Sequence, residues 1–137
     1  MFHYRKNLKK YRDYPNPKVC TFCEDDLVGR KVETTKYAYV VPNRTFYDLW
    51  ELRAVTDHLL IIPKRHVRSM DELTSHERKD IMDLMCKYEA KNYNVYARAI
   101  NSKQRSVGHQ HTHLIKTHDK RAHGSLNIQK PYVLIKF

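Results

Sequence analysis

Two apolar runs in the first half of the chain have the pattern of β-strands. Residues 36–41 are mostly aromatic or β-branched and end at Pro42, and residues 58–62 form an almost purely apolar run that ends at Pro63. Proline ends a strand readily because it has no N–H to donate to the ladder. Since consecutive side chains point to opposite faces of a sheet, the second run indicates a central strand that is buried on both faces.

Residues 75–91 have the pattern of an amphipathic helix. Its apolar stripe consists of four residues at positions i, i+3, i+4 and i+7, namely Ile81, Leu84, Met85 and Tyr88. This spacing places them on one face of a helix. Thr74, followed three residues later by Glu77, forms a capping box that indicates where the helix begins.

The remaining elements complete the predicted order. Further strands are expected at residues 95–100, 109–116 and 132–135, and residues 44–56 are expected to form a long loop or a short helix. One long helix among strands with mostly short connections favours an antiparallel α+β domain. Residues 1–18 have the composition of a basic arm, which in other proteins binds nucleic acid or is simply a terminus. Residues 19–137 are expected to form the single domain.

Composition adds a preference for an anionic partner. The chain has 137 residues, of which 41% are hydrophobic, and a formal net charge of +11. This charge favours a nucleotide or a nucleic acid as partner, although surplus lysine and arginine also serve solubility alone. No apolar run is long enough to cross a membrane, and no secretory signal is evident. We therefore expect no membrane partner and a cytoplasmic location.

Cys20 and Cys23 are separated by two residues, a gap that lets two thiolates bind one metal ion. The same spacing occurs in redox-active pairs, but no thioredoxin-like βαβ pattern surrounds it here. The chain has 3 cysteines in all, and an odd number argues against a disulfide framework. The third, Cys86, lies within the predicted helix and is expected in the core.

His109, His111 and His113 alternate along a predicted strand. Alternate side chains of a strand share one face, with Cβ atoms about 6.5–7 Å apart. Three imidazoles on one face have three alternative roles. They bind a metal, they place a nucleophile beside groups that hold an anion, or they are simply packed there. Strict alternation makes simple packing the weakest of these alternatives, and the cysteine pair offers a better metal site. The nucleophile interpretation is therefore preferred.

These motifs resemble those of the histidine-triad (HIT) family of nucleotidyl hydrolases and transferases. Residues 109–115 are similar to the family's triad, and Ser106-Val107 precedes them as in the family. Residues 58–66 resemble the block in which a histidine, an apolar strand and Ile-Pro-Lys-x-His follow one another. Residues 41–44 resemble the segment with Asn-Arg in the fragile-histidine-triad branch. The resemblance covers residues 19–117.

The resemblance implies a HIT-like α+β fold with a five-stranded antiparallel sheet and one long helix, often in a homodimer. It also implies transfer or hydrolysis at the α-phosphate of a nucleotide, with adenine as the favoured base. His111 would attack and form a nucleotidyl-histidine, with His113 as proton donor and His109 as the third catalytic histidine. The chemistry is consistent, since an imidazole with an ordinary pKa of about 6.5 is largely neutral at pH 7.

Three substrate-binding residues are carried over by the resemblance. Asn43 would meet the ribose hydroxyls, and Asn101 and Ser106 would hydrogen-bond the phosphoryl oxygens as charge builds. Both asparagines are equally explained as turn residues.

The resemblance also implies a structural zinc site. Several histidine-triad proteins, and the related galactose-1-phosphate uridylyltransferases, complete a CxxC pair with two histidines. Here the four ligands would be Cys20, Cys23, His66 and His109. Such a closed site would tie the N-terminal segment to the histidine strand. The alternative is a pair of reduced cysteines without metal.

The sequence departs from the family pattern at three places. Gln110 and Thr112 stand where the family has apolar residues, which predicts a more polar back face. The loop at residues 101–106 lacks the family's paired glycines and carries two cations, which suit additional phosphates or a solvated turn. The stretch at residues 44–56 is longer than usual. It brings three aromatic residues for base capping, a dimer contact or the core, namely Phe46, Tyr47 and Trp50.

Three hypotheses for the function follow. The leading one is hydrolysis or transfer on a small nucleotide, such as a dinucleoside polyphosphate, a nucleoside phosphoramidate or a nucleotide sugar. The second is aprataxin-like removal of adenylate from nucleic-acid 5′ ends, which the charge favours and the absence of a second zinc module in the tail disfavours. The third is a zinc-stabilised module that binds nucleotides or RNA without turnover. His111→Ala separates an enzyme from a binder.

Overall fold

An antiparallel sheet is the framework of the protein in the computed structural model, which describes residues 3–4, 20–23, 25–121, 125–129 and 132–136. Its seven strands are β1 (His3–Tyr4), β2 (Glu33–Thr34), β3 (Ala38–Pro42), β4 (Leu49–Trp50), β5 (Arg53–Pro63), β6 (Asn94–Ala97) and β7 (Thr112–Arg121). Strands β2, β3, β5, β7 and β6 lie side by side in that order. β4 pairs with the start of β5, and β1 pairs with β4.

The α+β class and the antiparallel sheet are confirmed. Of the five strands expected from the sequence, four are β3, β5, β6 and β7 of this sheet, and the two-residue strands β1, β2 and β4 bring its total to seven. The predicted strand number was therefore too low. Apart from β1, the basic arm at residues 1–18 lies outside the described residues, so the structure does not test its boundary with the domain.

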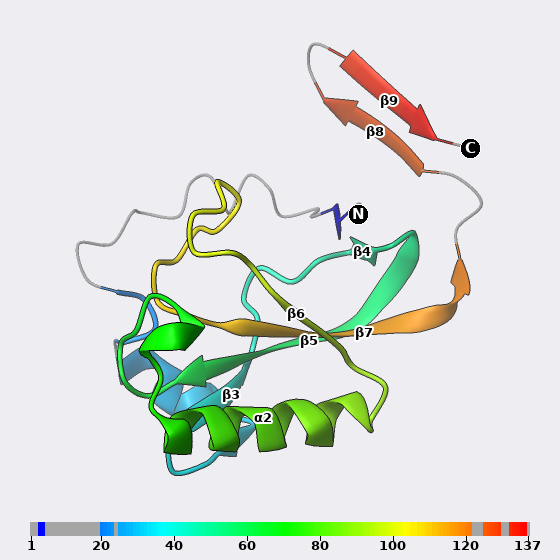
Figure 1. Ribbon diagram of the computed structural model, residues 1–137. Helices are drawn as coiled ribbons and strands as arrows, with labels where there is room; N and C mark the ends of the chain where they lie inside the picture. The colour runs from blue at the N-terminus through cyan, green and yellow to red at the C-terminus, as the bar shows by residue number, and fades with distance from the viewer. Residues whose placement is uncertain (1–2, 5–19, 24, 122–124, 130–131, 137) are drawn as a thin grey trace.

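A second, smaller sheet follows the main one. β8 (Ser125–Gln129) and β9 (Tyr132–Lys136) pair with each other, and Figure 1 shows this hairpin apart from the main sheet. The strand predicted at residues 132–135 is thus present, as part of this hairpin. None of the helices in the described part of the chain is long and apolar enough to cross a membrane.

Helix α2 (Ser75–Glu89) begins at the predicted capping box. The side chain of Thr74 accepts from the N–H of Glu77 at 3.3 Å, and the side chain of Glu77 accepts from the N–H of Thr74 at 2.8 Å. These two bonds satisfy backbone donors that the first turn of a helix leaves without partners. The predicted start of the helix is confirmed, and its end comes two residues earlier than expected.

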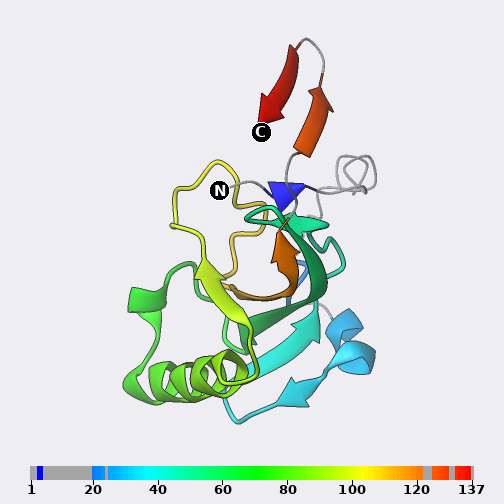
Figure 2. The same cartoon turned by 90° about the vertical axis from the view of Figure 1, so that its right-hand side faces the viewer.

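Both faces of β5 are buried, as its apolar run predicts. Leu59 and Ile61 pack with α2 on one face, while Leu60 and Ile62 belong to a cluster on the opposite face. Figure 2 shows α2 and the 3-10 helix Asp25–Arg30 on opposite sides of the sheet. His113 of β7 is the direct partner of Leu60 and therefore shares its face. This face, away from α2, therefore carries both His58 and His113.

Residues 44–48 form a loop, as one of the two alternatives predicted, whereas residues 49–56 belong to a β-hairpin that the pattern did not predict. β4 and β5 are joined through Glu51 and Leu52, whose φ angles are 51° and 62°. Two consecutive positive φ angles are typical of a type I′ turn, whose twist matches that of a two-residue hairpin. The pattern was missed because neither residue is Gly or Asn. Tyr47 and Trp50 are buried and stack at 5.8 Å, so these two aromatics belong to the core.

The strand predicted at residues 109–116 begins only at Thr112. In the register of the sheet His111 would face Ile62 and Gln110 would face Pro63, which has no N–H. The carbonyl oxygen of Pro63 instead accepts from Nε2 of His109 at 2.9 Å. Gln110 donates its own N–H to the carbonyl of Val67 at 2.7 Å, in the loop after β5. The first two triad histidines therefore lie ahead of the regular strand.

Candidate active site and metal centre

The three histidines of the triad are all buried, with exposed fractions of 1% for His109, 8% for His111 and 4% for His113. The rings of His111 and His113 are close neighbours, with centroids 5.1 Å apart. Buried imidazoles need hydrogen-bond partners. Those partners determine which nitrogen of each ring carries a proton.

His111 presents an unprotonated Nε2. Its Nδ1 lies 2.8 Å from the backbone carbonyl oxygen of His109. A carbonyl oxygen only accepts, so Nδ1 donates, and in the neutral ring Nε2 keeps its lone pair. Burial lowers the pKa of His111 below its usual 6.5, and the charges of Arg105 and Arg98 lower it further. The ring is therefore neutral at pH 7 and has a nucleophilic nitrogen.

His113 presents a proton at Nε2. The backbone N–H of Tyr47 donates to Nδ1 of His58 at 3.1 Å, so a neutral His58 carries its proton on Nε2. That Nε2 lies 2.9 Å from Nδ1 of His113. Nδ1 of His113 accepts, which leaves the proton of this ring on Nε2. The two neighbouring triad rings thus offer a lone pair and a proton.

Tyr47 and Arg98 flank these rings. The centroid of the Tyr47 ring lies 4.6 Å from that of His58 and 5.7 Å from that of His113. Its hydroxyl accepts from Nη2 of Arg98 at 2.7 Å, and the guanidinium of Arg98 lies 5.6 Å from the centre of the Tyr96 ring. A guanidinium oriented in this way beside the histidines suits recognition of a phosphate.

The sequence suggested that Arg105 binds additional phosphates or lies in a solvated turn. In the structure it instead holds backbone carbonyl groups. Its guanidinium donates to the carbonyl oxygens of Val107 at 3.2 Å, Arg68 at 2.6 Å and Gly108 at 3.0 Å. These bonds join the loop before the triad to the segment after β5. Arg105 therefore fixes the loop while its charge still lowers the pKa of His111. Lys103, the other cation, is exposed.

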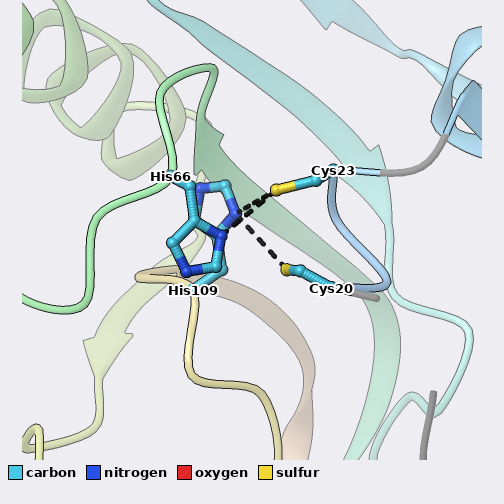
Figure 3. A group of neighbouring side chains, drawn as sticks. All are labelled: Cys20, Cys23, His66 and His109. Carbon is cyan, nitrogen blue, oxygen red and sulfur yellow. Dashed lines mark hydrogen bonds between the residues drawn. The ribbon is translucent and has the colours of Figure 1, made fainter. Parts of the chain in front are cut away.

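A second group of side chains lies beside the triad (Figure 3), and the atoms that could bind a metal all lie within 4.8 Å of one another. Nδ1 of His109 is 3.7 Å from Sγ of Cys20 and 3.5 Å from Sγ of Cys23. Sγ of Cys23 is also 3.2 Å from Nδ1 of His66. In a tetrahedral zinc site, bond lengths of about 2.0–2.3 Å place ligand atoms about 3.3–3.8 Å apart. The four residues therefore fit one tetrahedral ion.

The ring of His109 is oriented for this role. Its Nε2 donates to the carbonyl oxygen of Pro63 at 2.9 Å, so the lone pair of Nδ1 faces the sulfur atoms. Metal-binding histidines commonly donate their other N–H to a carbonyl in this way. Burial, with a contribution from His66, lowers the pKa of His109 to about 4. The ring is thus neutral, as a metal ligand must be.

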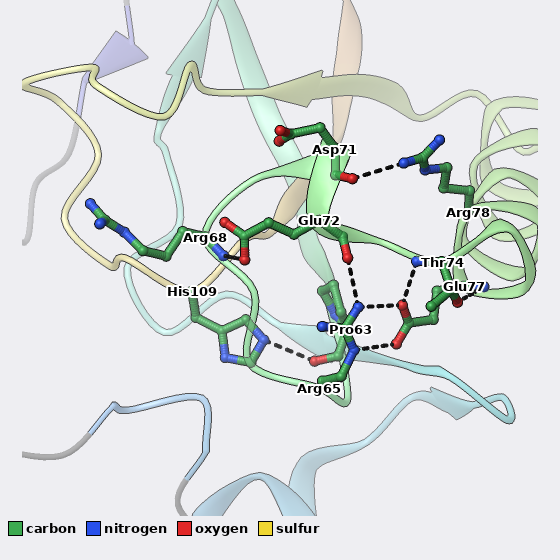
Figure 4. A network of polar contacts seen from close by, with 9 residues as sticks. All are labelled: Pro63, Arg65, Arg68, Asp71, Glu72, Thr74, Glu77, Arg78 and His109. Atoms are coloured by element: carbon green, nitrogen blue, oxygen red, sulfur yellow. Dashed lines mark hydrogen bonds and ion pairs between the residues drawn. The ribbon is translucent and has the colours of Figure 1, made fainter.

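The loop that carries His66 is fixed to the start of α2 (Figure 4). Arg65 donates to both carboxylate oxygens of Glu77, at 2.9 and 2.7 Å, and to the carbonyl oxygen of Glu72 at 2.7 Å. The hydrogen bond from Arg65, with those of the capping box, lowers the pKa of Glu77 to about 2. A permanently charged Glu77 therefore links the helix to the loop between β5 and His66.

The three predicted substrate-binding residues lie at different places. Asn43 follows β3, and its amide nitrogen is 3.1 Å from Nε2 of His58. Its Oδ1 accepts from the N–H of Thr45 at 3.1 Å, so it is also a turn residue. Asn101 and Ser106 are exposed in the loop before the triad, and within the described part of the chain neither side chain hydrogen-bonds to a histidine.

Other polar residues that the sequence singled out are now placed. Gln110 and Thr112 are buried, and Nε2 of Gln110 donates to Oγ1 of Thr112 at 3.3 Å. The back face of the triad is thus polar and buried. Cys86 is exposed, which corrects the expectation that it lies in the core. His118 is also exposed, and His123 lies outside the described residues.

Sequence reasoning missed several residues of this site, above all His58, Tyr47 and Arg98. His58 was identified only as the start of a motif. Its signal was that of a histidine at the head of a central apolar strand, where a buried polar group needs a partner. Tyr47 was expected only to cap a base, contact a second copy or pack in the core, and Arg98 had no signal, because only the hairpin and the end of β6 bring them to the histidines.

The comparisons with known proteins agree with the HIT-like fold. Residues 53–120, about half of the chain, match the family model of the HIT domain. A histidine triad nucleotide-binding protein from Candida albicans has a similar structure, with a TM-score of 0.56 and 20% identity over 83% of this chain and 84% of its own. A HIT family hydrolase from Clostridium thermocellum gives 0.54 and 18%, over 75% and 94%.

A third similar structure is the diadenosine triphosphate hydrolase of Plasmodium falciparum, with a TM-score of 0.53 and 17% identity over 83% of this chain and 80% of its own. At these identities the likeness concerns the fold, which is HIT-like. No curated protein matches the chain.

Proposed function

We propose that this chain, which carries a HIT domain at residues 53–120, hydrolyses or transfers nucleotidyl groups through a covalent intermediate on His111. The observation that carries the proposal is the hydrogen bond from Nδ1 of His111 to the carbonyl of His109. It leaves Nε2 with a lone pair, and burial keeps the ring neutral. Such a nitrogen attacks phosphorus without a separate strong base.

In the first step, Nε2 of His111 forms a bond to the α-phosphorus while the bond from phosphorus to the leaving group breaks. The leaving oxygen departs with the bonding electron pair and accepts a hydrogen bond from Nε2–H of His113, the nitrogen on which the hydrogen bond from His58 keeps the proton. The His111 ring becomes positively charged as the P–N bond forms. Its Nδ1–H still points at the carbonyl of His109, which stabilises that charge.

In the second step, water or another acceptor attacks the phosphorus and the P–N bond breaks. The electron pair of the P–N bond returns to Nε2 of His111, which so regains its starting state, and the proton of the incoming group goes to the solvent. Arg98 and Arg105 place positive charge beside His111, where negative charge grows on the phosphoryl oxygens. We expect Asn43 to meet the ribose, with Asn101 and Ser106 at the phosphate.

The names of similar proteins support a nucleotide as substrate. The protein from Candida albicans is named as nucleotide-binding, and that from Plasmodium falciparum as a diadenosine triphosphate hydrolase. We therefore propose an adenine nucleotide with a leaving group at the α-phosphate. The formal net charge of +11 also suits a longer anion, so an adenylated nucleic-acid 5′ end is the second candidate.

We also propose that Cys20, Cys23, His66 and His109 bind a structural zinc ion. The support is the tetrahedral spacing of their ligand atoms and the orientation of the His109 ring. When bound, the ion supplies a cross-link between the CxxC turn (residues 20–23), the loop after β5 and the triad.

A homodimer in the cytoplasm is the expected state of the protein. In the described part of the chain β6 pairs with β7 alone, and Val95 on this edge strand is 40% exposed. An exposed edge with an apolar side chain suits pairing with a second copy. Light scattering of the purified protein measures the assembly directly.

The deciding experiment offers wild type and His111→Ala a panel of substrates. The panel contains a diadenosine polyphosphate, an adenosine phosphoramidate, a nucleotide sugar and a 5′-adenylated oligonucleotide, with nucleotide release followed by chromatography. His118→Ala, at an exposed histidine of β7, is the matched control. Turnover by wild type and His118→Ala but not by His111→Ala supports the enzyme. If neither the wild type nor His111→Ala turns over any substrate, yet both bind nucleotide equally, the protein is a binding module.

A further inference from the structure

We propose that Phe22 is a positioning residue through which metal binding at the CxxC turn controls the orientation of the nucleophile His111. The inference goes beyond the structural zinc site, because it names a ring contact by which the ion acts on the chemistry. The test of this proposal by activity rests on the proposed function, whereas its test by NMR does not.

The contact is direct. Phe22 stands between the two cysteines in a turn that the N–H of Cys23 closes on the carbonyl of Cys20 at 2.9 Å. The centroid of the Phe22 ring lies 5.2 Å from that of His111, with the planes at 74°. It lies 6.0 Å from that of His109, at 65°. Edge-to-face contacts at these distances are attractive and depend on orientation.

The CxxC turn is joined to the rest of the protein mainly through its sulfur atoms. Among the described residues, the hydrogen bonds that leave residues 20–23 run from the two cysteines to His66 and His109. Thiols and imidazoles hold each other weakly, whereas a shared ion holds all four ligands at once. The apolar packing of Phe22 on the cluster around Leu60 and Ile62 is then its other attachment.

His111 in turn depends on this ring. One hydrogen bond, from Nδ1 to the carbonyl of His109, fixes a single point of the imidazole. Two ring contacts limit the orientation of the imidazole about that point, one with His113 and one with Phe22. Because Nε2 must lie in line with the bond that breaks, a displacement of about 1 Å costs about 100-fold in rate. Loss of the ion would loosen Phe22 and therefore His111.

The test compares wild type, Phe22→Ala and Tyr39→Ala. Tyr39 is a matched control, since it packs on the same apolar cluster as Phe22. In the described part of the chain it has no ring contact with a histidine. Phe22→Leu keeps most of the bulk without an aromatic face and serves if the alanine variant fails to fold. Each full-length protein is studied with zinc bound and after chelation.

Three measurements are made on each protein: zinc affinity by competition with a chelator, the imidazole NMR signals of His111, and kcat on the substrate that the panel identifies. The His111 signals are assigned by their loss in His111→Ala. We expect Phe22→Ala to bind zinc within about threefold of wild type and to lose roughly tenfold in kcat, a change of about 1.4 kcal/mol in barrier. Chelation should then lower kcat of this variant little further, because the same contact is already lost.

The NMR signals give the readout that does not need turnover. Chelation should shift the His111 signals in wild type and in Tyr39→Ala, and much less in Phe22→Ala. Equal shifts in all three proteins, or wild-type signals and kcat in Phe22→Ala, would overturn the proposal. If no protein turns over substrate while the expected NMR pattern is observed, the proposed function fails and the coupling through Phe22 stands.

Discussion

His58 and His113 are joined by a hydrogen bond of 2.9 Å between Nε2 of the former and Nδ1 of the latter. The backbone N–H of Tyr47 fixes the direction of this bond by donating to the other nitrogen of His58. A main-chain group of the β4–β5 hairpin segment therefore determines which nitrogen of His113 carries a proton. The position of the proton on His113 is thus set by backbone geometry, whereas charged neighbours act on the pKa of His111.

Replacing His58 should slow the departure of the leaving group more than the attack by His111. His58→Leu removes the donor that keeps the proton of His113 on Nε2, so kcat should fall roughly 10- to 100-fold, the usual cost of losing an orienting partner of a functional histidine. His58→Gln, which still offers an N–H, should lose less. The measurement is kcat with two substrates whose leaving groups differ in basicity. An equal loss for both leaving groups would contradict the role of His113 as hydrogen-bond donor to the leaving group.

The activity should have an acidic limb below pH 6.5. The pKa of His111 lies below its usual 6.5, first because the ring is buried and then because Arg105 and Arg98 are near. Arg98→Gln removes a cation that disfavours the protonated ring, so the pKa should rise and the limb should move to higher pH. The profile of kcat/KM between pH 4 and 8 measures this. Lys103→Gln, with the same charge change at an exposed residue, should leave the limb in place.

The metal-free protein should lose stability as the pH falls from 6.5 toward 4. The pKa of His109 is 6.5 when unperturbed and about 4 in the folded protein, so in this window the unfolded chain binds more protons. Stability therefore rises with pH and falls on acidification. The loss should be about 1–3 kcal/mol, since one pKa unit corresponds to about 1.4 kcal/mol. Urea unfolding at pH 7 and pH 5 measures it, and a constant midpoint would show that His109 is not held neutral.

Removing the metal should lower the melting temperature. A ligand present at 100 to 1,000 times its dissociation constant stabilises by about 3–4 kcal/mol, which corresponds to about 10 °C for a domain of this size. Chelation should produce this fall in wild type, and Cys23→Ser should produce it without chelator. Cys86→Ser, at an exposed cysteine of α2, is the control. Purified protein that contains no zinc and melts unchanged with chelator would rule out the site.

The hairpin turn should be improved by glycine. Glu51 is exposed and has a φ of 51°, a conformation that costs residues with a Cβ about 1 kcal/mol. Glu51→Gly should therefore stabilise the protein by about 0.5–1 kcal/mol, measured by chemical unfolding. Glu51→Ala, which keeps the Cβ, should not stabilise it. Stabilisation by alanine as well would assign the effect to the lost charge instead.

The sequence by itself determined the elements whose causes are local. Thr74 and Glu77 make a capping box within one turn of helix, and the structure has it where the pattern indicates. The apolar run from Leu59 to Ile62 indicates burial on both faces because consecutive side chains alternate, and the two clusters confirm it. The resemblance to the family also grouped Cys20 and Cys23 with His66 and His109, and the structure brings these four residues together.

Only the tertiary structure decided how the histidines are used. The strand begins only after His111, because the preceding residues bond elsewhere: Gln110 donates its N–H to the carbonyl of Val67, and His109 donates to that of Pro63. His58, Tyr47 and Arg98 meet the triad through pairing and a hairpin turn whose residues carry no glycine signal. Which nitrogen of an imidazole holds the proton depends on the atoms that face it. Those atoms come from segments far apart in the chain, so no pattern along the sequence could reveal them.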